Sequence, residues 1–360
     1  MRSRRQYFPL GKALSIVSLL AQISLFPVAA IGAAPAGGPA VSPTPATSPT
    51  PAPLRVALVY DIGGRGDKSF NDLAYAGLER ARSELGIQYR VAEPTGGQER
   101  EVHLRRFAAG DAEVIVGVGF LFSDDIARIA AQFPQKKFIC IDYTVKPGEP
   151  IPPNLLGLRF RENEGSFLVG AIAGLFTKTK RVGFVGGAES PLIKKFEAGY
   201  VAGVRQVCPD CNVSVAYAGV TGKAFTDPAK GKELALAMYQ AGADVIYHAS
   251  GSTGLGVFKA AEEQKKFAIG VDADQSGEAA PGIVITSMLK KVDEALFRAL
   301  KDAGEGRFQG GRAVEMGLRD GALDYVWNDT NRELLGPAIR ERVEDLKARI
   351  IRGEIVVPAE

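Results

Sequence analysis

The residues best equipped to bind a ligand follow the first apolar segment of the chain. Asp61 to Asp72 read DIGGRGDKSFND and come directly after LRVALVY. This stretch combines carboxylates, a hydroxyl, an amide and a phenylalanine ring with three glycines, which let a backbone approach a ligand closely. Because open α/β sheets bind their ligands in loops at the carboxyl ends of strands, the stretch predicts a site for a small polar ligand with a flat face.

Comparable side chains follow other apolar segments. The candidate ligand-binding residues are Asp61, Ser69, Phe70, Asn71 and Asp142 in the first half of the chain and Phe196, Gly251, Asp272 and Lys290 in the second. A carboxylate can accept hydrogen bonds from two neighbouring hydroxyls, and a lysine can donate to the same oxygens. Two phenylalanines, one from each half, could cover both faces of a heterocycle, with stacking worth ~1–3 kcal/mol per base. The set favours a ligand with a hydroxyl-rich end and an aromatic face.

Several candidates also have a purely structural interpretation. Asp142 and Asp272 could cap turns, and Phe196 could occupy the core side of a helix. Phe70 could act as a hydrophobic staple at a helix start. Further strand ends carry Phe120, Ser252 and Gln275, while Asp67, Asp72 and Asp274 are interpreted as loop polarity. The sequence leaves these alternatives open.

Enzyme motifs are missing from the sequence. It contains no G-x-x-x-x-G-K-[ST] phosphate loop and no G-x-S-x-G elbow, and DIGGRG lacks the G-x-G-x-x-G register of a dinucleotide fold. With only two histidines, a metal cluster is not expected either. We therefore expect a binding protein without catalytic residues, cofactor or metal. A hydrolase acting on the same ligand is the weaker alternative, because no histidine supports the carboxylates.

The N-terminus has the pattern of an export signal. Four basic residues and no acid precede an apolar run at 13–33 that ends in small residues, as in a secretory signal peptide. The paired arginines also match a twin-arginine signal, so both export routes stay open. An uncleaved anchor is the alternative, since 21 apolar residues can span a bilayer. We expect a signal peptide at 1–33 with no lipid-anchor cysteine after it, a Pro/Ala/Thr-rich linker at 34–53 and a periplasmic location.

The net charge belongs to that N-terminal segment. Removing residues 1–33 takes away four positive charges and changes the formal charge from +3 to −1. A near-neutral protein offers no case for a nucleic-acid partner. We expect a monomer.

Two of the three cysteines form the local pair Cys208-Pro-Asp-Cys211. In an exported protein such a pair favours a disulfide. A redox-active site is the alternative, but the pair lies between a helix and a strand and does not open a helix. The third cysteine, Cys140, lies inside an apolar strand and is interpreted as a core thiol.

From residue 54 onward, short apolar segments alternate with helical periodicity. The predicted strands are 54–60, 89–93, 114–119, 136–142, 155–160, 180–186, 212–218, 244–249, 267–272 and 283–287. Several are continuous apolar runs, which are typical of sheets covered by helices on both faces. Asp227 and Pro228 form a helix start, with an N-cap acceptor followed by proline. About ten strands in strand–helix alternation predict an α/β protein with two doubly wound parallel-sheet lobes.

Two internal echoes support the two lobes. RVALVYDIGG at 55–64 is similar to RVGFVGGAES at 181–190. KKFICID at 136–142 is similar to KKFAIGVD at 265–272, and each of these ends on an aspartate.

The sequence also resembles a known family. DIGGRGDKSFNDLAYAG, ENEGSFLVGAIAG, KKFEAGYVAGV, GSTGLGVFKAA, GVDADQ and TSMLKKVDEAL occur in the order found in the basic membrane protein family, and the likeness runs from about Arg55 to about Pro358. Members of this family are substrate-binding proteins of ABC importers, similar to the purine nucleoside receptor. The chain departs from the family in its CxxC pair, in GSTGLG, where AG-x-TGLG is more usual, and in lacking the anchor cysteine of many members.

The resemblance implies a type I periplasmic-binding fold, with two lobes joined by three hinge crossings that close on a ligand. The implied lobes are 54–158 with about 283–312, and 159–282 with about 313–360. By the family pattern, Phe70 and Phe196 would sandwich a purine, Asn71 and Asp142 would contact the base edge, and Asp61, Gly251, Asp272 and Lys290 would hold the ribose. The implied partners are the permease and ATPase of an ABC importer. A sugar or other metabolite, bound for transport or for presentation to a sensor, is the alternative.

Overall fold

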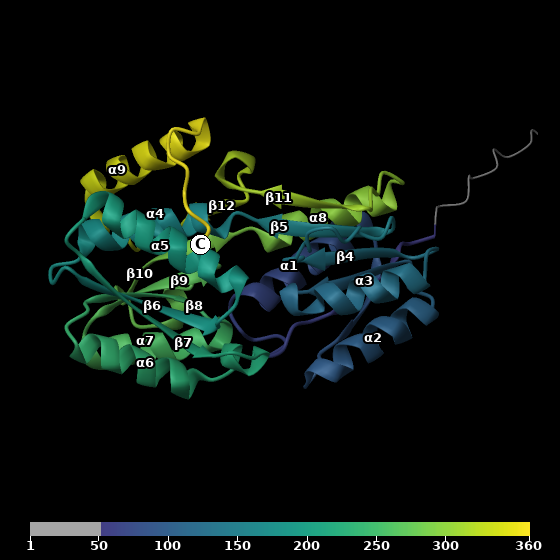
Figure 1. Cartoon of the computed structure of the whole chain (residues 1–360), viewed down its shortest axis with the longest axis horizontal. Helices are drawn as coiled ribbons and strands as arrows, with labels where there is room; N and C mark the ends of the chain where they lie inside the picture. Colours follow the sequence, from purple (N-terminus) through teal and green to yellow (C-terminus); the bar gives the residue numbers. More distant parts are fainter. Residues whose placement is uncertain (1–51) are drawn as a thin grey trace, which may run out of the picture. The chain divides into compact units, whose positions relative to one another are not determined.

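The computed structural model of the protein describes residues 52–360 (Figure 1). The predicted signal peptide at 1–33 and nearly all of the predicted linker at 34–53 lie outside the described residues. Residues 52–360 form two sheets, each built of six strands.

The first sheet contains β1 (Arg55–Val59), β2 (Gln88–Ala92), β3 (Val114–Val118), β4 (Lys137–Ile141), β5 (Leu155–Phe160) and β11 (Arg312–Met316). The second contains β6 (Arg181–Ala188), β7 (Asn212–Gly219), β8 (Val245–Ala249), β9 (Phe267–Asp272), β10 (Val284–Lys290) and β12 (Leu323–Tyr325). Their orders, β11-β5-β4-β3-β1-β2 and β12-β10-β9-β8-β6-β7, match strand for strand. All described neighbours are parallel except β10 and β12. Both sequence echoes therefore fall on equivalent strands, β1 with β6 and β4 with β9.

The described helices are α1 (Phe70–Leu85), α2 (Gly97–Ala109), α3 (Ser123–Gln132), α4 (Glu162–Phe176), α5 (Pro191–Val207), α6 (Pro228–Gln240), α7 (Gly254–Gln264), α8 (Val292–Gly304) and α9 (Arg332–Arg352). In the second lobe, α6 and α7 cover one face of the sheet, and α4 and α5 cover the other (Figure 1). In β1, alternate residues enter different cores, Val56 and Leu58 on one face and Ala57 and Val59 on the other. Burial on both faces explains the continuous apolar strands. Within residues 52–360, no helix combines the length and apolarity needed to cross a bilayer.

The chain passes between the sheets three times, which confirms the predicted two-lobed fold. The passages lie between β5 and α4, between β10 and α8, and between β11 and β12. Helix α8 belongs with the first lobe, because Glu294 on α8 is paired with Arg80 on α1, whose guanidinium also stacks on Phe297.

The expected lobe boundaries at 283 and 312 need correction. Strand β10 pairs with β9 and remains in the second sheet, whereas β11 pairs with β5 in the first. The chain therefore returns to the first lobe after Lys290, at the end of β10, and stays there through Met316, at the end of β11. Strand pairing over long sequence separations decides this assignment, and the local apolar pattern carries no information about it.

All ten predicted strands are confirmed, but β11, β12 and α9 were not predicted. Both strands lie at sheet edges, and β12 has only three residues. Helix α9 is interrupted at Gly336, where φ is 76°, and continues from Pro337. This break and the many charged residues of α9 obscure its helical periodicity. The predicted start of α6 is confirmed, since Asp227 Oδ1 accepts a hydrogen bond from Lys230 N at 2.9 Å.

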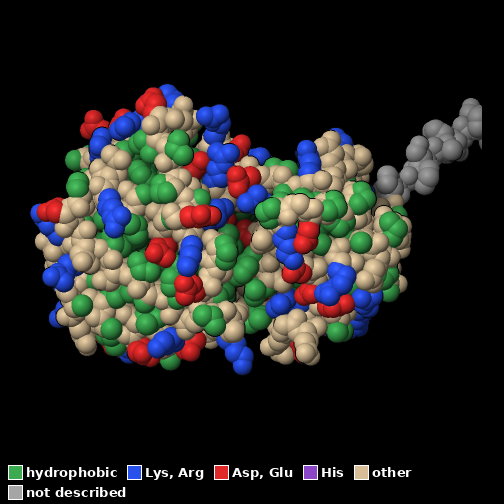
Figure 2. Space-filling model, in the orientation of Figure 1, with side chains coloured by type: hydrophobic (Ala, Val, Ile, Leu, Met, Phe, Trp, Pro, Cys, Tyr) green, Lys and Arg blue, Asp and Glu red, His purple; other side chains and the backbone are tan. Residues whose placement is uncertain are grey.

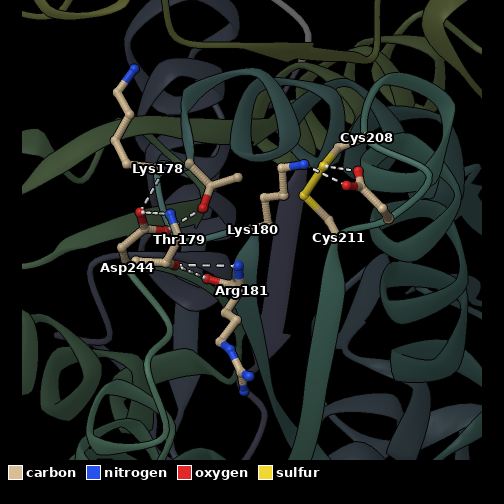
Figure 3. The surroundings of a disulfide bond; sticks show 9 residues. Lys178, Thr179, Lys180, Arg181, Cys208, Cys211 and Asp244 are labelled. Carbon is tan, nitrogen blue, oxygen red and sulfur yellow. Dashed lines mark hydrogen bonds and ion pairs between the residues drawn. A yellow bond between two sulfur atoms is a disulfide. The ribbon is translucent and has the colours of Figure 1, made fainter.

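Charged side chains of both signs are interspersed on the face of residues 52–360 displayed in Figure 2, which shows no extended basic patch. Cys208 and Cys211 are joined by a disulfide at the turn between α5 and β7 (Figure 3). Lys180, which directly precedes β6, pairs with Asp210 of this turn at 2.5 Å. Cys140 is a buried free thiol, as predicted.

Candidate functional site

A cavity between the lobes is surrounded by the carboxyl ends of strands from both sheets. It encloses about 640 Å³, a volume that includes space open to solvent. The first lobe contributes Asp61, Ile62, Gly63, Asp67, Phe70, Asn71, Gly119, Phe120 and Asp142 to its lining. The second contributes Leu192, Ile193, Phe196, Phe225, Ala249, Ser250, Gly251, Ser252, Val271, Asp272 and Lys290. Eight of the nine predicted site residues thus line one cavity, and Ser69 does not.

Asp142 and Asp272 occupy equivalent positions in the two lobes. Asp142 directly follows β4, Asp272 ends β9, and these strands hold the same place in their sheets. Both have left-handed backbones, with φ of 59° and 66°. Non-glycine residues adopt this conformation at an energetic cost, and such residues concentrate at functional sites. The internal sequence echo therefore marks a matched pair of carboxylates on opposite walls of the cavity.

Lys290 lies at the centre of a buried charge network. Its Nζ is 2.7 Å from Asp142 Oδ2 and 3.1 Å from Glu162 Oε1, and the three side chains are 1%, 4% and 0% exposed. Lys195 Nζ is 2.6 Å from Glu162 Oε2. Two ammonium groups and two carboxylates balance in charge, as buried ions require.

This network explains the direction of two pKa shifts. Burial by itself would lower the pKa of Lys290, but the surrounding carboxylates outweigh burial and raise it. Burial would raise the pKa of Glu162, but Lys290 and Lys195 outweigh it and lower that pKa. Both groups stay charged. Glu162 and Lys195 were not predicted as site residues, although an acid just after the apolar strand LLGLRF was a usable signal.

Two carboxylates retain capacity for a ligand. Asp142 Oδ1 is buried and has no hydrogen-bond partner within residues 52–360, and a buried acceptor of this kind calls for a donor. Asp61 Oδ1 accepts from the backbone of Ile62 at 2.8 Å. A Cβ added to Gly119 would lie only 2.3 Å from Asp61 Oδ2, and the φ of Gly119 is 106°. Both observations explain why this position is a glycine. Burial raises the pKa of Asp61 to about 7 and that of Asp272 to about 6.

Asp67 organises the first-lobe loop. Its carboxylate accepts hydrogen bonds from the backbone N–H groups of Ser69, Asn71 and Asp72 at 2.9–3.2 Å and so caps α1. Asn71 is partly committed to the same loop, because its Oδ1 accepts from Asp61 N and its Nδ2 donates to Asp67. One N–H and one lone pair of that amide remain for a ligand.

Ser69 has a different position from the one predicted. It is fully buried, and its hydroxyl donates to Asp272 Oδ2 at 2.5 Å, across 203 residues of sequence. Ser69 therefore links the two lobes and orients a cavity carboxylate.

Four phenylalanine rings reach the cavity. Phe70 and Phe196, from opposite lobes, both lie beside Lys290, whose Nζ is 5.1 Å and 5.6 Å from their ring centroids, within cation–π range. Phe120 and Phe225, also from opposite lobes, meet edge to face at 6.4 Å. Phe225 was not predicted; its position just before the Thr226-Asp227-Pro228 helix start was the available signal.

The backbone of Gly251 packs closely against the backbone of Phe225. Its φ is 55°, and an added Cβ would lie 3.1 Å from the carbonyl oxygen of Phe225. A side chain at this position would strain the backbone and crowd its neighbour.

Two parallel-sheet lobes with three crossings and a cavity at the strand ends define a type I periplasmic-binding fold. The sequence profile described as "ABC transporter substrate-binding protein PnrA-like" matches residues 54–360. The chain belongs to this family of ABC transporter substrate-binding proteins, which confirms the resemblance noted from the sequence.

Individual relatives agree with this assignment. A "CD4+ T-cell-stimulating antigen" of Listeria monocytogenes is 35% identical over 84% of this chain and 87% of its own length. The "ABC transporter nucleoside-binding protein BmpA" of Lactococcus lactis is 32% identical over 85% of this chain and 89% of its own. A solute-binding protein structure from Aeropyrum pernix K1 has a TM-score of 0.78 at 32% identity and covers 86% of this chain and 94% of its own.

Proposed function

We propose that this protein is an exported receptor of an ABC importer, which binds a purine nucleoside between its lobes and delivers it to the permease. The observation that supports this most is the lining of the cavity. Phe70 and Phe196 come from opposite lobes, and the carboxylates of Asp61, Asp142 and Asp272 lie in the same cavity. Rings with hydrogen-bonding carboxylates suit a ligand that has a flat base and a hydroxyl-rich sugar.

In this proposal Asp61, Asp272 and Lys290, with the backbone of Gly251, hold the ribose. Asn71 and Asp142 contact the base edge. Since Asp142 and Lys290 form an ion pair, they act as one unit where base and sugar meet. The partnerless Oδ1 of Asp142 accepts a hydrogen bond from the ligand.

Binding needs no bond to be made or broken. Closing the lobes excludes water, so hydrogen bonds to charged groups strengthen in the lower dielectric. The four aspartates in the lining repel an added phosphate, so the ligand is a nucleoside and not a nucleotide. The receptor acts as a monomer and releases its ligand to a permease–ATPase pair.

Isothermal titration calorimetry tests the proposal on folded protein from which bound ligand has been stripped. Inosine, guanosine and adenosine are titrated beside inosine monophosphate and galactose. We expect at least one purine nucleoside to bind in the micromolar range or tighter, with at least tenfold weaker binding of the monophosphate. Binding of galactose, with no heat from any nucleoside, would transfer the assignment to a sugar receptor.

A further inference from the structure

Gln275 connects the lobes without lining the cavity. It lies three residues beyond Asp272 in the second lobe and is fully buried. Its Nε2 donates to the carbonyl oxygen of Lys68, in the first-lobe loop, at 3.1 Å. With the bond from Ser69 to Asp272, this gives the loop two polar links to the segment that follows β9.

The direction of the Gln275 amide is fixed from within its own lobe. Its Oε1 accepts from Val271 N at 2.8 Å and lies 3.0 Å from His248 Nε2. A backbone N–H can only donate, so the oxygen must face Val271 and the NH₂ group must face Lys68. His248 then carries its proton on Nε2, and its Nδ1 lies 3.3 Å from the hydroxyl of Ser250, which can donate to it.

The surroundings leave this arrangement little freedom. His248 is fully buried, and a Cβ on Gly254 would lie 2.0 Å from its ring. A Cβ on Gly270 would lie 2.8 Å from Gln275 Oε1. The backbone N of Gln275 donates to Ser287 Oγ at 3.1 Å. All these groups belong to the second lobe, which therefore holds the amide in place independently of the first.

The carbonyl group of Lys68, which accepts the hydrogen bond from Gln275, is also held in position by contacts within its own lobe. Lys68 has a left-handed backbone, with φ of 56°, and its N–H donates to Asp72 Oδ2 at 3.1 Å. Asp67 holds the next residue, Ser69, by its backbone N–H. When donor and acceptor are both ordered beforehand, little conformational entropy is lost as they meet.

We propose that Gln275 is a closure latch, a positioning residue held by His248 that bonds to the first lobe when the lobes come together and slows ligand release. The inference rests on the proposed function for its consequence, slow ligand release, whereas the bond between Gln275 and Lys68 requires only that the lobes come together. It extends that function by assigning the lifetime of the closed state to a residue outside the cavity. Its link to the loop also keeps Ser69 next to Asp272, and so couples closure to the orientation of that carboxylate.

The first test is the dissociation rate of inosine, measured by stopped flow. Gln275→Met removes the latch, and Asn331→Leu is the matched control. Asn331 is another buried amide of the second lobe, but it donates to Ile285 O and Val326 O of its own lobe. We expect about tenfold faster dissociation for Gln275→Met, an association rate within about threefold of the parent, and no change in either rate for Asn331→Leu.

A second variant, Gln275→Glu, tests the latch while keeping the contacts of this side chain within its own lobe. Gln275→Glu at pH 8 keeps an acceptor for Val271 and His248 but turns a second oxygen toward the Lys68 carbonyl. We expect its dissociation rate to rise at least as much as that of Gln275→Met. Unchanged dissociation within twofold for Gln275→Glu, or an equal increase for Asn331→Leu, would overturn the latch.

A readout without ligand separates the latch from the proposed function. Spin labels are attached at Val102→Cys in the first lobe and Val220→Cys in the second, which are 62% and 77% exposed. The latch predicts that Gln275→Glu shifts the distance distribution between the labels toward longer values and that Asn331→Leu does not. If no nucleoside binds but this shift occurs, the latch stands and the ligand assignment fails. If the distribution does not move, the latch is refuted whatever the ligand.

Discussion

Lys290 Nζ lies 2.7 Å from Asp142 Oδ2, so the last residue of a second-lobe strand is paired with the strand end of the first lobe. Both side chains are almost fully buried. Replacing such a pair with apolar residues is often neutral or stabilising, so a buried ion pair is weak evidence for a stabilising role. The pair lines the cavity together with the carboxylates of Asp61 and Asp272. This position favours a role in ligand binding.

Removing the ammonium group should destabilise the fold strongly. Lys290→Met leaves Asp142 and Glu162 buried without their shared cation, and breaking a buried pair costs about 3–5 kcal/mol. Urea denaturation should show a loss of this size, while Lys291→Met, at an exposed neighbouring position, should change the free energy of unfolding by less than about 0.5 kcal/mol. Equal stability of the two variants would contradict the network.

Asp272→Asn should weaken nucleoside binding. A hydrogen bond to a charged group contributes about 1.5–3 kcal/mol, which corresponds to a ten- to hundredfold loss of affinity. Calorimetry with inosine measures this loss. The control is Asp274→Asn, an exposed carboxylate that does not line the cavity and should leave the affinity within twofold.

Binding should also depend on pH through Asp272. Burial raises the pKa of this carboxyl to about 6. In the proposed complex, ligand hydroxyls donate to its ionised form. Protonation therefore competes with binding, so the contribution of Asp272 to the affinity should be constant above about pH 7 and fall below about 6, approaching tenfold per pH unit. Titrations of inosine between pH 5 and 8 check this. In Asp272→Asn the part of the fall due to Asp272 should vanish; an identical pH profile in the variant would assign the titration to another group.

Asp61 should make the protein less stable as the pH rises. Burial raises the pKa of Asp61 to about 7, so between about pH 4 and 7 the folded protein holds a proton that the unfolded chain has lost. Its contribution to stability therefore falls with increasing pH in that window. At ~1.4 kcal/mol per pKa unit, Asp61→Asn should raise the free energy of unfolding at pH 8 by an amount on the order of a few kcal/mol. The exposed Asp111→Asn should not, and a destabilised Asp61→Asn at pH 8 would contradict the prediction.

The rings distinguish a nucleoside from a sugar. Phe70→Ala should reduce inosine affinity by about 1–3 kcal/mol, the range for base stacking. Phe196→Ala should reduce affinity and also stability, because Phe196 lies on α5 and is buried in the hydrophobic core. Phe225→Ala tests the ring that sequence reasoning missed.

Phe308→Ala is the control for these rings, since Phe308 is a partly buried ring outside the cavity lining. Full affinity in both Phe70→Ala and Phe196→Ala would remove the predicted sandwich. If Phe225→Ala alone then lost affinity, one face of the base would belong to Phe225.

The site could be predicted to the extent that its signals are local. An apolar strand that ends on an acid is visible in KKFICID and KKFAIGVD, and these segments place Asp142 and Asp272 in the cavity. The loop from Asp61 to Asp72 was recognisable for the same reason. Long apolar runs interrupted by helical periodicity likewise predicted ten strands and two lobes.

What the sequence by itself determined was the identity of the strands, the carboxylates at their ends and, through shared motifs, the family. Only the tertiary structure decided which groups meet: Lys290 with Glu162, Ser69 with Asp272, and Gln275 with Lys68. It also decided that β10 and β11 belong to opposite sheets. These contacts join residues more than a hundred positions apart, so they depend on how two lobes pack around three crossings, and local pattern carries no record of that packing.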